Sequence, residues 1–347
     1  MNKPGLLALH RSLALAFAPL LLLQALTGAA LLFREPLARL IDPAGMSALL
    51  HSGPAASIAK LATSAEAAMP GFRLRRIFLP AAPEATALAE LAGSDGVVRY
   101  ASLDPGSARV LASGSIWRFP MEAALQLHYR LMDGRLGLAI VLLNGLALLA
   151  LAGSGLGFWW PGRKRALKSL AIRKSLPARA RLRGWHRTGG VAVSLVILSS
   201  ALSGVLLVVP DLAATPAAAA PAAPDRPSPA MIDGAVARAQ KQFPAAGLRD
   251  IRFPPADRID VNFLAPEHNP RAVHVVSVRL SDGEILKRLP AQANPVLWMK
   301  VLTLHTGDSA GLAGRLLLLA EALVLALLAV SGPVMWWQAR RRRQKGR

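Results

Sequence analysis

Four long apolar runs alternate with polar segments along the chain. The runs lie within residues 13–33, 128–161, 188–210 and 305–337. A helix needs about 20 mostly apolar residues to cross the hydrocarbon core of a bilayer, and each run is long enough. The pattern therefore predicts an α-helical membrane protein with four transmembrane helices and two extramembrane segments.

The four runs belong to an internal duplication, because the first two recur as the last two at an offset of 176 or 177 positions. Each half reads as a span, an extramembrane segment and a second span, with a histidine ahead of each span. Parallel repeats of this kind predict two halves related by an axis along the membrane normal. The matching positions include His10 and His186, Gly28 and Gly204, His128 and His305, Ser154 and Ser331, and Trp159 and Trp336.

A cleaved signal peptide is the alternative interpretation of the first run. Basic residues precede this run, and small residues occur at Gly28-Ala29-Ala30. The run is longer than the roughly 7–15 apolar residues of a typical signal-peptide core. Its counterpart at 188–210 lies inside the chain, where it cannot be a signal. We therefore expect residues 1–33 to keep the first run as a transmembrane helix.

The segments 34–127 and 211–304 have the pattern of small domains that combine a helix with an antiparallel sheet. One helix is predicted in each, over 57–69 and 232–243, because each amphipathic stretch ends at a proline. Residues 213–230 form a Pro/Ala-rich linker without a core of its own. Short β-prone runs bounded by turn residues predict the strands. These strands are 73–79, 97–103, 109–111, 248–253, 259–264, 272–280 and 284–289.

Positive charge orients the predicted spans. Residues 162–187 contain ten Lys or Arg and no acidic residue, and six more lie in 340–347. Because basic residues collect on the cytoplasmic side of membrane proteins, the loop 162–187, the tail 338–347 and the N-terminus are expected inside. Both extramembrane domains are then outside. The net charge of +21 is concentrated beside the spans, which argues against a nucleic-acid-binding surface.

The amino-acid composition supports a membrane protein and excludes several kinds of cofactor. Hydrophobic residues make up 53% of the 347 residues, which four spans account for directly. The chain has no cysteine. This absence excludes disulfides, iron–sulfur clusters, thiolate zinc sites and covalently attached c-type haem.

The paired histidines suggest a cofactor. The orientation places His10 and His186 at the inner membrane face, and His128 and His305 at the outer face. A pseudo-twofold axis brings equivalent residues together, so each pair could supply both axial ligands of a haem iron. Zinc is a weaker hypothesis, because it takes three or four protein ligands and no third ligand recurs with either pair. The histidines without a matching histidine are expected to be ordinary polar residues: His51, His268 and His274.

Other polar residues near the spans have two interpretations each. Glu321 and its counterpart Asn144 lie within the apolar runs, and a carboxylate at mid-membrane costs about 2.5–3.5 kcal/mol on insertion scales. The pair could form a proton or polar relay, or Glu321 could be protonated or simply face Asn144 or Gln24. The arginines near the histidines could bind haem propionates or merely contact lipid headgroups. They are Arg11, Arg187, Arg130, Arg135 and Arg315.

Several segments resemble the PepSY-associated transmembrane family: LHRSLALAFAPLLLLQALTGAALLF, WHRTGGVAVSLVILSSALSG, and LHTG followed by GLAGRLLLL and SGPVMWW. The resemblance covers nearly the whole chain, and the extramembrane segments are similar to PepSY domains. It implies a bacterial inner-membrane reductase that carries electrons to a ferric-siderophore or other ferric chelate in the periplasm and releases Fe(II) for uptake. By the same resemblance, His10, His186, His128 and His305 would ligate two b-type haems per chain.

One departure from this pattern is that residues 129–133 lack the Thr-Gly that follows His305, so the outer site is expected to be asymmetric. The chain has no flavodoxin-like or ferredoxin-reductase segment, so the electron donor must be a separate cytoplasmic reductant or a quinol. Two other functions stay open at this point. One is a non-enzymatic permease or accessory protein for iron–siderophore uptake, and the other is a regulatory protein of the PepSY type.

Overall fold

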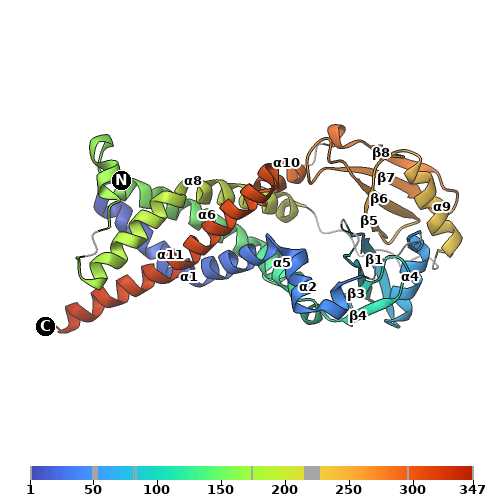
Figure 1. Cartoon of the computed structure of the whole chain (residues 1–347), viewed down its shortest axis with the longest axis horizontal. Coiled ribbons are helices and arrows are strands. Elements are labelled where there is room, and N and C mark those ends of the chain that lie inside the picture. The colour runs from blue at the N-terminus through green and yellow to red at the C-terminus, as the bar shows by residue number, and fades with distance from the viewer. Residues whose placement is uncertain are drawn as a thin grey trace. The chain divides into compact units, whose positions relative to one another are not determined.

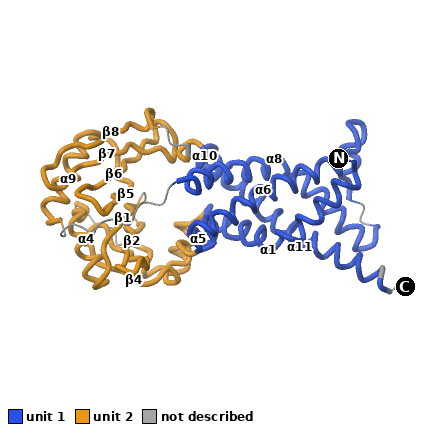
Figure 2. The backbone as a smooth tube through the Cα atoms, turned by 180° about the vertical axis from the view of Figure 1, so that it is seen from behind, with its two compact units in different colours: residues 1–32, 124–214, 301–347 blue, residues 33–123, 215–300 orange. Residues whose placement is uncertain are grey.

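A computed structural model describes residues 2–48, 54–80, 82, 84–172, 175–214, 227–294 and 297–345. The chain forms two compact units, each assembled from separate stretches of sequence (Figure 2). Unit 1 contains residues 1–32, 124–214 and 301–347, and unit 2 contains residues 33–123 and 215–300. The predicted linker lies mostly outside the described residues, as does His51.

Unit 1 is built on four long helices: α1 (Lys3–Leu31), α6 (Gly134–Trp159), α8 (Ala178–Ala213) and α11 (Gly311–Lys345). All four are long and apolar enough to cross a membrane. Helix α1 packs against α6 and α11, and α8 packs against the same two helices. The apolar stretch of each helix is apolar on nearly all sides, which suits a bundle whose outer surface meets lipid, whereas the start of α8 and the end of α11 are basic.

Two short helices precede spans in unit 1: α5 (Pro120–Arg130) and α10 (Leu297–His305). They carry His128 and His305, which the sequence pattern placed at the heads of the spans themselves. The break after α5 passes through left-handed backbone at Leu131 and Met132, with φ of 47° and 58°. The break after α10 uses Gly307, with φ of 74°. A glycine adopts this conformation at little cost, so the first break is the more strained of the two.

In its described residues, unit 2 has one antiparallel sheet rather than two separate ones. Its eight strands run in the order β4-β3-β2-β1-β5-β6-β7-β8, which is symmetric about the pairing of β1 with β5 (Figure 1). The segments expected to fold as two domains therefore share a single sheet. The strands are β1 (Phe72–Phe78), β2 (Ala87–Gly93), β3 (Val98–Leu103), β4 (Val110–Gly114), β5 (Leu248–Arg252), β6 (Arg258–Leu264), β7 (Val273–Arg279) and β8 (Ile285–Leu289).

Helices α4 (Ile58–Ala67) and α9 (Pro229–Gln240) pack against each other and cover one face of this sheet. The core beneath them includes fully buried Leu61, Ile77 and Phe263. On the other face, a smaller apolar cluster around Tyr100 and Phe119 covers part of β2, β3 and β4. The remaining short helices are α2 (Arg34–Ile41), α3 (Pro43–Met46) and α7 (Ala166–Ser169).

Candidate functional site

The structure brings the four repeated histidines of unit 1 together as two pairs. The ring centroids of His10 and His186 are 6.5 Å apart, and those of His128 and His305 are 6.1 Å apart. Since His10 and Thr27, a neighbour of His128, are 17 residues apart on α1, the pairs lie roughly 25 Å apart along the bundle. Each pair takes one histidine from each half of the chain.

A backbone carbonyl fixes the tautomer of three of the four rings. Carbonyl oxygens only accept hydrogen bonds, so an Nδ1 atom that contacts one must carry the proton. In a neutral imidazole, the lone pair is then on Nε2, the atom left free to bind a metal. The contacts join Nδ1 of His10 to Leu151 at 3.0 Å, of His128 to Gln24 at 3.1 Å and of His305 to Ser200 at 3.1 Å.

A Ser or Thr hydroxyl also lies beside Nδ1 of every ring. Thr27, Ser154 and Ser203 donate to a carbonyl of their own helix at 2.6–2.7 Å, so they accept from the histidine. For His186, the hydroxyl is the only Nδ1 partner among the described residues. The distances are 3.3 Å from Ser154 to His10, 3.1 Å from Thr27 to His128, 2.7 Å from Ser331 to His186 and 3.0 Å from Ser203 to His305.

A glycine follows each of these hydroxyl residues, and Gly28, Gly155 and Gly204 make room for the ring, whereas a β-carbon on Gly332 would lie at an ordinary 3.7 Å from Cε1 of His186. A β-carbon built on Gly28 would lie 3.0 Å from Cε1 of His128, and one on Gly155 would lie 3.2 Å from Cε1 of His10. These distances are shorter than an ordinary van der Waals contact. Any larger residue would push the ring away from its position. The Ser/Thr-Gly dipeptide thus supports a histidine from another helix through both its hydroxyl and its missing side chain.

The separation of the ring centres within each pair is compatible with two imidazoles bound to one metal ion. A metal–nitrogen bond of about 2.0 Å and about 1.15 Å from nitrogen to ring centre place the two ring centres about 6.3 Å apart. The observed separations of 6.5 and 6.1 Å bracket this value. Within the described ranges, no third His, Asp or Glu joins either pair in a group of potential metal ligands. Each pair could therefore supply two imidazole nitrogens to a haem iron.

The five arginines expected near the histidines have different surroundings. Arg135 donates to the carbonyls of Leu212 and Ala214 at 2.7 Å each, at the end of α8. Arg315 is paired with Asp308 at 2.7 Å, and its charge is neutralised there. The guanidinium of Arg130 lies 5.1 Å from the ring centroid of Tyr129, and its Nε is buried without a hydrogen-bond partner among the described residues. Arg11 and Arg187 are exposed, which suits contact with headgroups as well as with a propionate.

Glu321 is linked through Ser200 to His305, and so to the pair of His128 and His305. Its side chain is 6% exposed and accepts a hydrogen bond of 3.3 Å from the Ser200 hydroxyl. The carbonyl of the same Ser200 accepts from Nδ1 of His305. Glu321 thus contacts Ser200 rather than Asn144 or Gln24. Asn144 is also buried, and its Oδ1 has no hydrogen-bond partner among the described residues.

The remaining described histidines lie outside this arrangement, in unit 2. The His274 ring stacks on Phe243 with centroids 4.1 Å apart, accepts from the Ala291 amide at 3.0 Å and pairs with Glu267 at 3.0 Å. These contacts satisfy both ring nitrogens and give His274 a structural role. Two pairs of adjacent tryptophans, Trp159-Trp160 and Trp336-Trp337, lie at the cytoplasmic ends predicted for α6 and α11. The Arg341 guanidinium lies 3.8 Å from the Trp337 ring centroid.

The sequence analysis used the Ser/Thr-Gly dipeptides only as markers of the repeat and did not assign them a role. Their spacing contained a usable signal. Each dipeptide lies near the end of a span, and a histidine lies at or near the start of the same span. Neighbouring spans are antiparallel. The hydroxyl at the end of one span therefore lies level with the histidine at the start of the next. The residues concerned are Thr27, Ser154, Ser203 and Ser331.

Comparison with known protein families matches residues 7–339 to the PepSY-associated TM region. The match covers nearly the whole chain, so the chain belongs to this family. Together with the four apolar helices, this membership identifies a multi-pass membrane protein with an extramembrane α+β unit. A search of curated proteins returns no match.

Proposed function

We propose that this member of the PepSY-associated transmembrane family is a haem-containing reductase of the bacterial inner membrane. It passes electrons across the membrane to a ferric-siderophore or another ferric chelate in the periplasm and releases Fe(II) for uptake. The observation that supports the proposal is the arrangement of the four histidines in two pairs, with ring centroids 6.5 and 6.1 Å apart. At His10, His128 and His305 a carbonyl of another helix accepts from Nδ1 and leaves Nε2 available, and at His186 the Ser331 hydroxyl contacts Nδ1.

His10 and His186 would hold one b-type haem, and His128 and His305 a second. Haem bound at each pair would supply a one-electron Fe(III)/Fe(II) couple at each end of the bundle. The chain's own contribution is to orient the rings. At His10, His128 and His305 the Nδ1–H bonds fix ring angle and tautomer, and a hydrogen bond at that position raises the basicity of the ligating nitrogen. Gly28, Gly155 and Gly204 keep the space beside their rings open.

The orientation in the membrane follows from charge. Ten Lys or Arg residues in 162–187 and six in 340–347 favour the cytoplasmic side for this loop and for both termini. The two halves are then parallel repeats, with His10 and His186 at the inner face and His128 and His305 at the outer face. A separate cytoplasmic reductant or a quinol would donate electrons at the inner pair, and the ferric chelate would accept them near the outer pair.

A visible spectrum of the purified protein tests the cofactor. Bis-histidine coordination predicts the α and Soret bands of a low-spin, six-coordinate iron and about two haems per chain. Acid acetone should extract the haem, because the chain has no cysteine to hold it covalently. Colourless protein from haem-replete cells would refute the proposal and favour a non-enzymatic role in iron–siderophore uptake.

Reporter fusions test the orientation independently of the cofactor. Fusions at about residue 90 and residue 260 should report a periplasmic location. Fusions near residue 172 and at the C-terminus should report a cytoplasmic one. The reverse pattern would exchange the inner and outer roles of the two histidine pairs.

A further inference from the structure

A row of polar side chains crosses five strands of the sheet in unit 2. Strand pairing places Arg76 opposite Arg252, Arg252 opposite Asp260, Asp260 opposite Ser277 and Ser277 opposite Lys287. Directly paired residues on neighbouring strands share a face of the sheet. These five positions therefore lie on one face of β1, β5, β6, β7 and β8.

The polar row is on the face that α4 and α9 leave uncovered. The next row along the strands pairs Ile77 with Ile251, Ile251 with Val261 and Val261 with Val276. All four of these residues are fully buried in the core beneath the two helices. Because side chains alternate between faces, the polar row must lie on the opposite side. We call the row, with Arg249 and Arg258 beside it, the cationic face.

Asp250 holds the arginines of this face in place. It is fully buried and accepts from Nε of Arg76 at 2.8 Å and from Nε of Arg252 at 3.3 Å. Both of these contacts are to Oδ1, which also accepts from Asn262 at 2.8 Å, and a third guanidinium, that of Arg249, lies 3.8 Å from Oδ2. One carboxylate cannot neutralise three guanidinium groups. Excess positive charge therefore remains around it.

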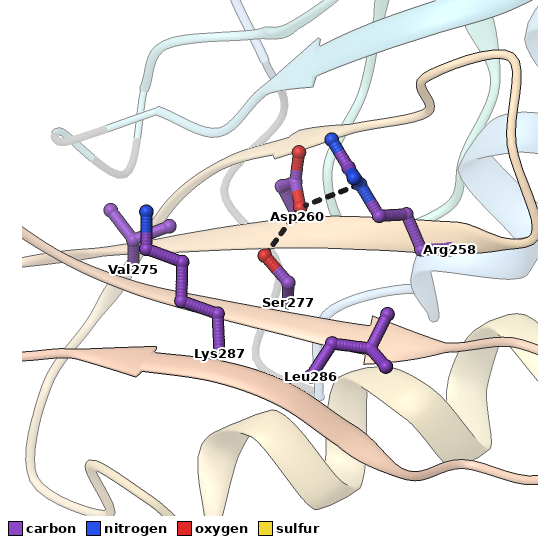
Figure 3. Close-up of a pocket in the computed structure, with 6 residues that line it drawn as sticks. All are labelled: Arg258, Asp260, Val275, Ser277, Leu286 and Lys287. Carbon is purple, nitrogen blue, oxygen red and sulfur yellow. Dashed lines mark hydrogen bonds and ion pairs between the residues drawn. The ribbon is translucent and has the colours of Figure 1, made fainter.

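A second carboxylate on the same face is also occupied. Asp260 accepts from the Ser277 hydroxyl at 2.6 Å and pairs with Arg258 at 3.4 Å (Figure 3). These residues line a pocket of about 350 Å³ together with Val275, Leu286 and Lys287.

Charge and free donors define what this face can bind. This part of the sheet carries five cationic groups and three carboxylates. The cationic groups belong to Arg76, Arg249, Arg252, Arg258 and Lys287, and the carboxylates belong to Asp250, Asp260 and Glu90, the last of which pairs with Arg76 across β1 and β2. The side chains of Arg252 and Arg258 are 48% and 46% exposed. Among the described residues, no partner is bonded to their Nη groups or to the Lys287 ammonium. Guanidinium forks of this kind bind carboxylates in a bidentate manner.

We propose that the cationic face binds the carboxylate groups of an anionic ferric chelate. The inference rests on the proposed reductase function and specifies its substrate class. From Arg252 to Lys287 the row spans three inter-strand steps, or roughly 14 Å. A ligand with several separate carboxylates contacts donors along this length, whereas a single small anion contacts only one or two. Cationic or neutral chelates gain nothing from this face.

Gallium(III) citrate tests the inference, because gallium is redox-inert and its complex reports binding without electron transfer. The probe is titrated into the detergent-solubilised full chain by calorimetry. We expect saturable binding that weakens as ionic strength rises. Ferrioxamine B, a cationic chelate, should not compete. Wild-type protein that does not bind gallium(III) citrate, or that binds metal-free citrate equally well, would overturn the assignment.

A charge-matched pair of variants locates the site. The double variant Arg252→Gln/Lys287→Gln removes two free cations from the cationic face and should bind gallium(III) citrate at least about tenfold more weakly. The control Lys60→Gln/Lys241→Gln removes two positive charges from α4 and the end of α9, on the other side of the sheet. An equal loss in the control would refute a specific site. The single variant Lys287→Gln, which breaks no ion pair among the described residues, keeps the test available should the double variant fail to fold.

The two proposals fail in different ways. Colourless protein that still binds gallium(III) citrate would refute the haem reductase and keep the binding site. Haem-loaded protein that reduces ferric chelates but shows no difference between the two double variants would refute the cationic face alone.

Discussion

Ser331 provides the most discriminating test of how the histidines are held. Among the described residues it is the only partner of His186 Nδ1, at 2.7 Å. Its counterpart Ser154 lies farther from His10, at 3.3 Å, and there the Leu151 carbonyl also accepts at 3.0 Å. Ser331→Ala therefore removes the whole Nδ1 contact of one ring, whereas Ser154→Ala leaves the stronger part in place. The two substitutions are chemically identical and occupy equivalent positions in the two halves.

The expected magnitudes follow from these contacts. Loss of a hydrogen bond to a metal-bound histidine weakens metal affinity by about 10- to 100-fold. We expect Ser331→Ala to weaken haem affinity by this amount. With the carbonyl contact retained, Ser154→Ala should cost less than about threefold, since a neutral hydrogen bond contributes about 0.5–1.5 kcal/mol and this one is long and shared.

Haem affinity is measured by removing the haem from purified protein and titrating haemin back, with the Soret band as readout. Ser331→Thr serves as the matched control, because it retains the hydroxyl and should restore affinity. Equal losses in Ser331→Ala and Ser154→Ala would show that the hydroxyls do not hold the rings as the structure indicates. A larger loss in Ser154→Ala would refute the reasoning outright.

Three other predictions follow from particular contacts. His10→Ala and His186→Ala should each lose the same one of two haems, and the double variant should retain as much haem as either single variant. Haem content is measured by the pyridine haemochrome assay, and loss of different haems would refute the pairing of histidines from different halves. Glu321→Gln should keep both haems and alter the midpoint potential of only one, because Ser200 links Glu321 to His305. Potentiometric titration measures the two potentials, and an unchanged potential would refute that link. Burial alone would raise the pKa of Asp250, but Arg76 and other arginines hold this pKa below its usual value. The stabilisation that Asp250 gives unit 2 is therefore present above about pH 4 and is lost as the pH falls through the folded-state pKa. Asp250→Asn should flatten the acid limb of the thermal-unfolding profile.

The local pattern of the sequence was sufficient to predict the four membrane helices and most of the strands. Long apolar runs and turn-bounded β-prone stretches depend only on neighbouring residues, which is why these elements are readable without a structure. Strand β2 is the exception among the described strands. Its residues Ala87–Gly93 include no β-branched or aromatic side chain, so propensity indicated nothing there. It is a strand because its neighbours β1 and β3 both pair with it.

The repeat also allowed the partners of the histidine pairs to be predicted, because an axis relating two halves brings equivalent positions together. The sequence did not indicate which atoms hold the rings. The link from Ser331 to His186 joins residues 145 positions apart, and the link from Ser203 to His305 joins residues 102 positions apart. Such contacts depend on the antiparallel packing of neighbouring helices, which no local pattern specifies.

The pairing of β1 with β5 is likewise a product of tertiary structure. Each half contains its own helix and strands, so the sequence by itself determined two similar α+β segments. Both segments have an apolar face and an unpaired edge strand, and joining the edges buries both faces under α4 and α9 while satisfying the backbone of β1 and β5. That junction brings Arg76 of one half onto Asp250 of the other. The four spans and the identity of the paired histidines thus follow from local composition and symmetry, whereas the ring supports and the cationic face exist only because distant segments pack together.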